Sequence, residues 1–251
     1  MDDLGLQGVG LVLSGGGARG MAHLGVYKAL LEMQIPVKAV SGTSAGALAG
    51  AFIAAGMNPD DTFQLFRKNR YFGWRNFVWG RDGLFTLQPM EALLKQELPS
   101  SFEELELPLF VACTDLVQGE IVFLSQGPLY AALLASAAVP LVFEPQRSQD
   151  KVLVDGGVLN NFPVEPLLND GLPILGVHVN RFESKPPQED WGKFYLAERC
   201  FHLAISGQVY HKKPSCSVFL DLPLGKYHMF DTDHAHEIFK IGYEETMKAL
   251  S

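Results

Sequence analysis

The chain has 251 residues, of which 47% are hydrophobic and 19% are charged, and its formal net charge is −8. This composition is typical of a globular protein that can bury a full core, and a single domain over residues 1–251 is the simplest organisation. The acidic excess disfavours nucleic-acid binding, which normally requires a basic surface.

The cysteines and the start of the chain bear on the cellular compartment. Cys113, Cys200 and Cys216 form no CxxC pair or other metal-ligand spacing, so we expect free thiols and no metal site. The segment Met1–Asp3 lacks the basic flank that precedes the apolar run of a signal peptide. We therefore expect a cytosolic protein.

The first four predicted elements alternate between strand and helix. Val9–Ser14 is an apolar run ended by glycines, and Met21–Met33 has large apolar residues spaced along one helical face. A short strand at Val37–Ser41 leads through a turn into a helix at Ala45–Ala55. This order implies parallel strands joined by crossovers, so the predicted class is α/β with a mostly parallel sheet flanked by helices.

The rest of the chain mixes helices and strands in the same way. Pro108–Asp115 and Glu120–Leu124 are predicted to pair as a hairpin. The other predicted helices cover Asn58–Asn69, Thr86–Glu97, Leu129–Ala137, Asp190–Tyr210 and Asp233–Leu250, and the other strands cover Lys151–Asp155, Ile174–Val179 and Ser217–Leu222. The uncharged segment Ala39–Pro59 has too few large apolar residues for a transmembrane helix, so no membrane span is expected.

The pentapeptide Gly42-Thr43-Ser44-Ala45-Gly46 is a G-x-S-x-G motif between a predicted strand and a predicted helix. A nucleophilic serine must be held on a sharp turn, where Gly42 and Gly46 avoid the clashes that a Cβ atom would cause. The N-terminus of a helix also favours negative charge developing near Ser44. The alternative is an ordinary helix cap, for which serine is a favoured residue.

A glycine-rich loop, Gly15–Gly20, directly follows the first strand. Its G-x-G-x-x-G spacing matches a dinucleotide fingerprint, but the acidic residue expected after the second strand is missing, so no nucleotide cofactor is predicted. Such a loop can instead turn its backbone N–H groups toward an oxyanion. Arg19 either lends positive charge there or pairs with an acidic residue at the surface.

The third motif, Asp155-Gly156-Gly157, lies at the end of the predicted strand Lys151–Asp155. A carboxylate at a strand end followed by two glycines can approach another backbone closely. Taken alone, however, the segment is better explained as a common Asp-Gly turn.

In this order and spacing, the three motifs resemble those of the patatin-like phospholipase family. Ala135–Pro140 is also similar to the family's A-S-x-A-x-P segment, and Asn160–Pro163 resembles the Asn-x-Pro stretch that follows its aspartate. The resemblance covers roughly residues 8–180 and therefore most of the chain.

This resemblance implies a three-layer α/β/α fold and a serine esterase that acts on lipids through a Ser–Asp dyad. Ser44 would be the nucleophile, Asp155 the proton acceptor, and the backbone amides of Gly15, Gly16, Gly17 and Ala18 the oxyanion hole. Because a free aspartate is a weak base near neutral pH, we expect partial burial to raise the pKa of Asp155.

Other interpretations stay open. Ser44 could use a histidine, as in α/β-hydrolases, from among His178, His202, His211, His228, His234 and His236. The chain could also be a catalytically silent interaction module, or it could transfer acyl groups to an alcohol other than water. His23 is expected to make a structural hydrogen bond, and Asp231–His236 to be an acid-rich helix start rather than a metal site.

Aromatic and basic residues interleave in the segment Tyr71–Arg81. This pattern suits peripheral contact with a membrane surface, where aromatic rings lie at headgroup level and cations meet anionic lipid. A loop whose aromatic side chains complete the core is an equally good interpretation.

Overall fold

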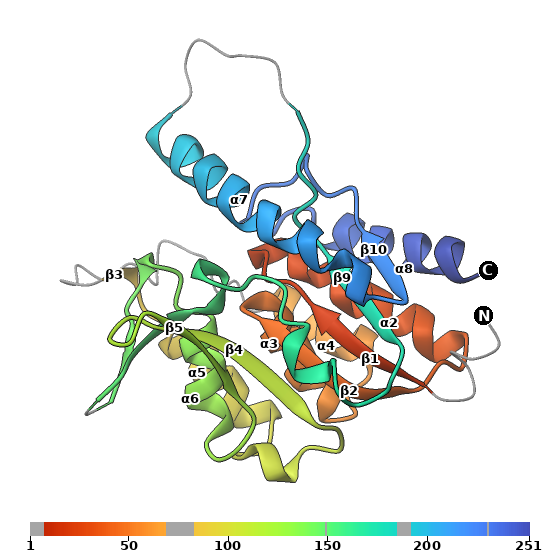
Figure 1. Cartoon of the computed structure of the whole chain (residues 1–251), viewed down its shortest axis with the longest axis horizontal. Helices are drawn as coiled ribbons and strands as arrows, with labels where there is room; N and C mark the ends of the chain where they lie inside the picture. The colour runs from red at the N-terminus through yellow and green to blue at the C-terminus, as the bar shows by residue number, and fades with distance from the viewer. Residues whose placement is uncertain (1–7, 69–82, 149, 185–191, 230) are drawn as a thin grey trace.

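The computed structural model describes residues 8–68, 83–148, 150–184, 192–229 and 231–251, and Figure 1 shows how their elements are arranged. Eight strands form one sheet in the order β10-β9-β1-β2-β4-β8-β7, with β5 also paired to β4. These strands are β1 (Val9–Leu13), β2 (Val37–Thr43), β4 (Leu109–Asp115), β5 (Glu120–Leu124), β7 (Gln146–Arg147), β8 (Val152–Asp155), β9 (Ile174–His178) and β10 (Val218–Asp221).

Helices cover both faces of this sheet. The α-helices are α2 (Met21–Glu32), α3 (Ala45–Ala54), α4 (Pro59–Lys68), α5 (Gln88–Glu97), α6 (Leu129–Ser136), α7 (Lys193–Lys212) and α8 (Ala235–Leu250). Short 3-10 turns add η1 (Gly17–Gly20), η3 (Phe102–Glu104), η4 (Gly156–Val158), η5 (Glu165–Leu167) and η6 (Lys213–Ser215).

Strand β1 lies near the centre of the sheet and is buried along its whole length. It pairs in parallel with β2 on one side and β9 on the other, which explains its continuous apolar sequence. Its side chains alternate between two cores: Leu11 and Leu13 join the larger one with α2, α3 and α8, and Val12 joins a smaller one that includes Val209 of α7. The predicted α/β class and three-layer arrangement are confirmed.

Strand β4 connects the parallel and antiparallel parts of the sheet. Its first half runs parallel to β2, with Ala112 opposite Thr43. Its second half runs antiparallel to β8, with Cys113 opposite Asp155. Two consecutive residues of β4 therefore align the ends of two strands that lie far apart in the chain.

Several elements differ from those expected. A separate two-stranded parallel sheet joins β3 (Gly83–Phe85) to β6 (Leu141–Phe143), and neither of these strands nor β7 was predicted, because runs of two or three residues show no period. The segment Ala39–Pro59 is divided between the end of β2, the turn at Ser44 and the ten-residue helix α3. No helix in the described ranges is long and apolar enough to cross a bilayer. The aromatic-basic segment Tyr71–Arg81 lies outside the described residues, so its membrane contact stays a prediction.

Candidate active site

Ser44 lies on a strained turn between β2 and α3. Its backbone has φ 54° and ψ −122°, a conformation that L-residues rarely adopt and that is typical of a functional constraint. A Cβ atom on Gly46 would lie 2.3 Å from the Leu13 carbonyl oxygen, and one on Gly42 would lie 2.6 Å from the Gly46 carbonyl carbon. The Ser44 side chain makes no capping hydrogen bond to α3, so the cap alternative is wrong.

A second serine holds this turn from the neighbouring helix. The Ser44 backbone N–H donates to Ser136 Oγ at 2.8 Å, and Ser136 Oγ in turn donates to the Ala112 carbonyl at 2.7 Å. Ser136 is fully buried at the end of α6. The sequence analysis assigned it no role, although a single hydroxyl in the apolar run Ala131–Val139 was a signal that it serves a buried partner.

Asp155 ends β8 and is only 3% exposed. Its Oδ1 accepts the Gly157 N–H at 2.7 Å, so the expected Asp-Gly turn is present, and its carboxyl group lies near the Ser44 side chain. Burial raises the pKa of Asp155 from 3.8 to about 6, against the opposing effects of the Ser44 hydroxyl and the Gly157 N–H. The expected increase in basicity is therefore present.

The glycine loop packs directly against the Ser44 turn. A Cβ atom on Gly15 would lie 3.1 Å from Ser44 Cβ, and one on Gly20 would lie 2.6 Å from Ala45 Cβ. On the other side of the turn, a Cβ on Gly156 would lie 2.4 Å from the Ala112 carbonyl oxygen. The three motifs thus converge because each provides glycines at the points of closest approach.

Only part of the glycine loop can serve as an oxyanion hole in this conformation. The N–H of Gly15 donates to the Asn161 carbonyl at 3.2 Å, and that of Ala18 donates to the Met229 carbonyl at 2.7 Å. Within the described part of the chain, the N–H groups of Gly16 and Gly17 have no acceptor. The expected set of four amides is therefore reduced to two.

Arg19 is buried, so the expected pairing with an acidic residue at the surface is wrong. Its Nε and Nη2 donate to the Tyr227 carbonyl at 3.0 and 2.7 Å, and its Nη1 donates to Asn180 Oδ1 at 2.9 Å. The guanidinium joins the glycine loop to two segments of the C-terminal part of the chain. Arg19 itself is not among the residues that line the cavity beside Ser44.

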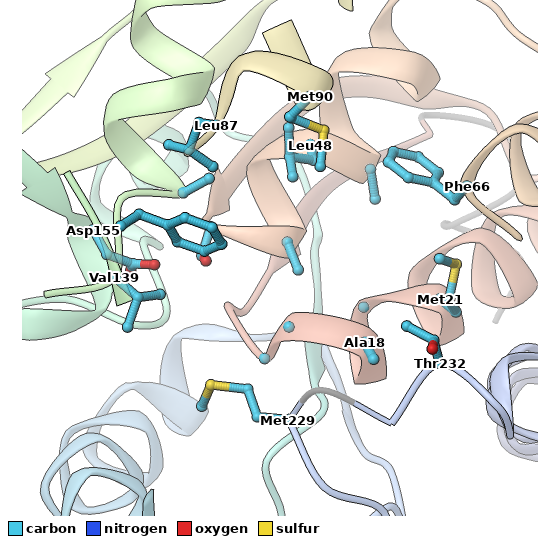
Figure 2. A pocket seen from close by; sticks show the side chains of 18 of the residues that line it. Ala18, Met21, Leu48, Phe66, Leu87, Met90, Val139, Asp155, Met229 and Thr232 are labelled. Carbon is cyan, nitrogen blue, oxygen red and sulfur yellow. The ribbon is translucent and has the colours of Figure 1, made fainter. Parts of the chain in front are cut away.

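Ser44 and Asp155 open onto a cavity whose wall is mostly apolar. Figure 2 shows Asp155 and Val139 at one end of the cavity, with Phe66 and Met21 at the other. Gly16, Gly17 and Asn161 also line it beside Ser44. The remaining large apolar lining residues are Leu24, Leu48, Leu87, Met90, Phe143, Ile205 and Met229. A chain of methylene groups extending from Ser44 would be surrounded by hydrocarbon.

No histidine of the described chain lines this cavity. His178 Nδ1 bonds Asp221 Oδ1 at 2.9 Å, His202 Nε2 bonds the Asn180 carbonyl at 2.7 Å, and His234 Nδ1 bonds the Asp231 carboxylate at 2.8 Å. His23 makes the expected structural hydrogen bond, from Nε2 to the Ser14 carbonyl at 2.8 Å. Burial lowers the pKa of His23 to about 4, so the ring is neutral. This arrangement disfavours a Ser–His–Asp triad.

Comparisons with known proteins agree with these features. The family model described as patatin-like phospholipase matches residues 11–168. An uncharacterised NTE-family protein of Mycobacterium tuberculosis is 33% identical over 195 residues, which cover 72% of this chain and 51% of that protein. The lysophospholipase nte1 of Emericella nidulans is 26% identical over 273 residues, covering 94% of this chain and 18% of that protein. The chain thus spans about half the length of the mycobacterial relative.

Solved structures share the fold. VipD from Legionella pneumophila superposes with a TM-score of 0.56 at 17% identity, covering 97% of this chain and 67% of that chain. Human GIVD cytosolic phospholipase A2 superposes with a TM-score of 0.50 at 11% identity, covering 99% of this chain and 59% of that chain.

Proposed function

The chain belongs to the patatin-like phospholipase family, and on that premise we propose that it is a serine hydrolase that cleaves acyl esters of lipids. Ser44 is the nucleophile in this proposal and Asp155 is its base. The observation that carries it is the proximity of these two side chains in the lining of one mostly apolar cavity.

The proposed reaction has two acyl-transfer steps. Ser44 Oγ attacks the ester carbonyl carbon while its proton passes to Asp155. The oxyanion that forms accepts hydrogen bonds from the N–H groups of Gly16 and Gly17. The tetrahedral intermediate then collapses, the alcohol leaves with the proton from Asp155, and an acyl-enzyme remains. In the second step, water attacks this ester, gives a proton to Asp155 and releases the fatty acid. The proton returns to Ser44.

A buried carboxylate suits this role. With a pKa of about 6, Asp155 is ionised at neutral pH and is a stronger base than an exposed aspartate. The apolar cavity supports a lipid acyl chain as the group bound beside Ser44, because burying each methylene contributes about 0.8 kcal/mol.

The proposal is tested with a chromogenic acyl ester and with a lysophospholipid. Ser44→Ala and Asp155→Asn are both expected to remain folded and to lose hydrolysis. Asp115→Asn is the matched control, because Asp115 is also buried at a strand end and accepts a turn N–H, from Val117 at 2.9 Å, but does not line the cavity.

Retention of wild-type activity by Asp155→Asn would remove Asp155 from the mechanism. Absence of any activity in the wild-type chain would instead favour the silent interaction module. Adding a competing alcohol and measuring the new ester separates hydrolysis from acyl transfer, since both proceed through the same acyl-enzyme.

A further inference from the structure

Two asparagine side chains hold the carbonyl oxygen of Gly15. Asn180 Nδ2 donates to it at 2.5 Å and Asn161 Nδ2 at 3.4 Å, and all three groups are buried. In a trans peptide the C=O and the following N–H point in opposite directions. Anchoring the Gly15 oxygen to Asn180 therefore turns the Gly16 N–H away from Asn180. Gly16 lines the cavity, whereas Asn180 does not.

The orientation of the Asn180 amide is fixed by Arg19. A guanidinium can only donate, so the side-chain atom that faces Arg19 Nη1 at 2.9 Å must be the oxygen Oδ1. The nitrogen Nδ2 is then left to face the Gly15 carbonyl. Arg19 is itself held by its two hydrogen bonds to the Tyr227 carbonyl, so this orientation does not depend on solvent.

The backbone of Asn180 is held from the opposite side by α7. Its carbonyl accepts hydrogen bonds from His202 Nε2 at 2.7 Å and from Ser206 Oγ at 3.4 Å. Gly16 also packs against this segment so closely that a Cβ atom on it would lie 2.4 Å from Val179 Cγ2. Asn180 is thus immobilised on both sides and touches the glycine loop at the peptide that precedes Gly16.

We propose that Asn180 is a positioning residue that aims the Gly16 N–H at the oxyanion of the ester-cleavage transition state. The inference rests on the proposed function, since it assigns a cause to the orientation of one oxyanion donor. Asn180 acts through the Gly15–Gly16 peptide and does not touch substrate. Its loss should therefore lower kcat and leave KM nearly unchanged, because a preorganised donor acts mainly on the charge that develops during reaction.

The main test is Asn180→Asp, measured with a soluble chromogenic ester. The aspartate keeps an acceptor for Arg19, but a carboxylate oxygen replaces the donor and repels the Gly15 carbonyl. We expect kcat to fall about 100-fold, as for loss of one oxyanion donor, with KM changed by less than about threefold. Asn58→Asp is the matched control, because Asn58 caps α4 through its Oδ1 and an aspartate can do the same.

A second measurement separates positioning from general damage to the cavity. A trifluoromethyl ketone with a matching acyl chain forms a tetrahedral oxyanion adduct with a serine, whereas the chain-matched alcohol fills the cavity without one. In Asn180→Asp, affinity for the ketone should fall in parallel with kcat/KM, and affinity for the alcohol should stay at the wild-type value. Asn180→Ala, which removes the donor without adding charge, should also lower kcat/KM and ketone affinity while leaving alcohol affinity at the wild-type value. It replaces the first variant if that variant does not fold.

The two proposals fail in different ways. If the wild-type chain hydrolyses esters through Ser44 while folded Asn180 variants keep kcat within about threefold, the role of Asn180 is wrong and the proposed function stands. Parallel loss of ketone and alcohol binding would also overturn the role of Asn180, since that result indicates a distorted cavity. If Ser44→Ala keeps wild-type activity, both proposals are overturned.

Discussion

Ser136 Oγ accepts the backbone N–H of Ser44 at 2.8 Å and donates to the Ala112 carbonyl at 2.7 Å, so one hydroxyl joins the strained turn to β4. A non-glycine residue in the conformation of Ser44 costs about 1–3 kcal/mol and persists only where neighbouring structure holds it. The Ser136 hydroxyl is one such restraint, because it satisfies a buried N–H that has no partner within α3.

We predict that Ser136→Ala lowers both stability and activity. Removing the hydroxyl leaves the Ser44 N–H without its acceptor, which costs about 1–3 kcal/mol in the free energy of unfolding, measured in urea. The turn should also relax, so kcat on a soluble ester should fall at least tenfold. Ser41→Ala is the control: Ser41 lies on β2, three residues before Ser44, is as buried as Ser136 and donates to the Pro163 carbonyl at 2.7 Å. It should lose similar stability and keep its kcat.

The rate of ester cleavage should depend on the ionisation of Asp155. Because burial raises the pKa of this carboxyl to about 6, kcat/KM should rise with pH up to about 6 and stay level above it. The measurement is kcat/KM for a chromogenic ester from about pH 4 to about pH 8. A constant kcat/KM over that whole range would be inconsistent with Asp155 as the base.

Asp155→Asn should make the protein more stable at neutral pH while removing its activity. Between pH 3.8 and about 6 the unfolded chain loses the Asp155 proton while the folded chain keeps it, so the wild-type protein loses stability as pH rises through this window. The full penalty, roughly 2–3 kcal/mol, is present above about pH 6. Asparagine has no such penalty and can still accept the Gly157 N–H.

Urea unfolding of both proteins at two pH values tests this expectation. The variant should be more stable by roughly 2 kcal/mol near pH 8 and nearly equal to wild type near pH 3.5. If the variant and the wild-type protein were equally stable at each of the two pH values, the Asp155 carboxyl would titrate alike in the folded and unfolded states.

Met21 should limit the length of the acyl chain that the cavity accepts. Its side chain lies at the end of the cavity remote from Asp155 (Figure 2), so Met21→Trp should block long chains and spare short ones. We expect kcat/KM for a laurate ester to fall at least tenfold while that for a butyrate ester changes little. Met33→Trp, at the other end of α2 and away from the cavity, should alter neither. Equal losses on both esters in Met21→Trp would contradict this placement of the chain.

Leu141 occupies an unfavourable position at a turn. It follows Pro140, has φ 69° and is 82% exposed, and the Val142 N–H donates to the Val139 carbonyl across the turn at 3.1 Å. Asparagine tolerates positive φ better than leucine does, so Leu141→Asn should raise the free energy of unfolding by about 0.5–1 kcal/mol. Leu168→Asn, at an exposed leucine with φ −65°, should give no gain in the same urea assay.

The main elements were predictable because their signals are local. A continuous apolar run marked β1, and glycines at Gly42 and Gly46 marked a turn at which two backbones meet. The same local chemistry made Ser44 a candidate, whereas Asp155 became one only through the resemblance of the three motifs together to the patatin-like family. Strands as short as β6 and β7 were missed, since a few residues contain too little periodicity to detect.

By itself, the sequence determined the α/β class, the strand–turn–helix around Ser44 and the residue types able to do acyl chemistry. Tertiary structure alone decided which groups meet: β4 pairs Ala112 with Thr43 and Cys113 with Asp155. It thereby brings together Thr43 and Asp155, which lie more than 100 residues apart in the chain. It also decided that Gly15 and Ala18 use their N–H groups internally and that Arg19 is buried. The physical reason is that strand register, burial and hydrogen-bond partners arise from contacts between distant segments, which local patterns do not encode.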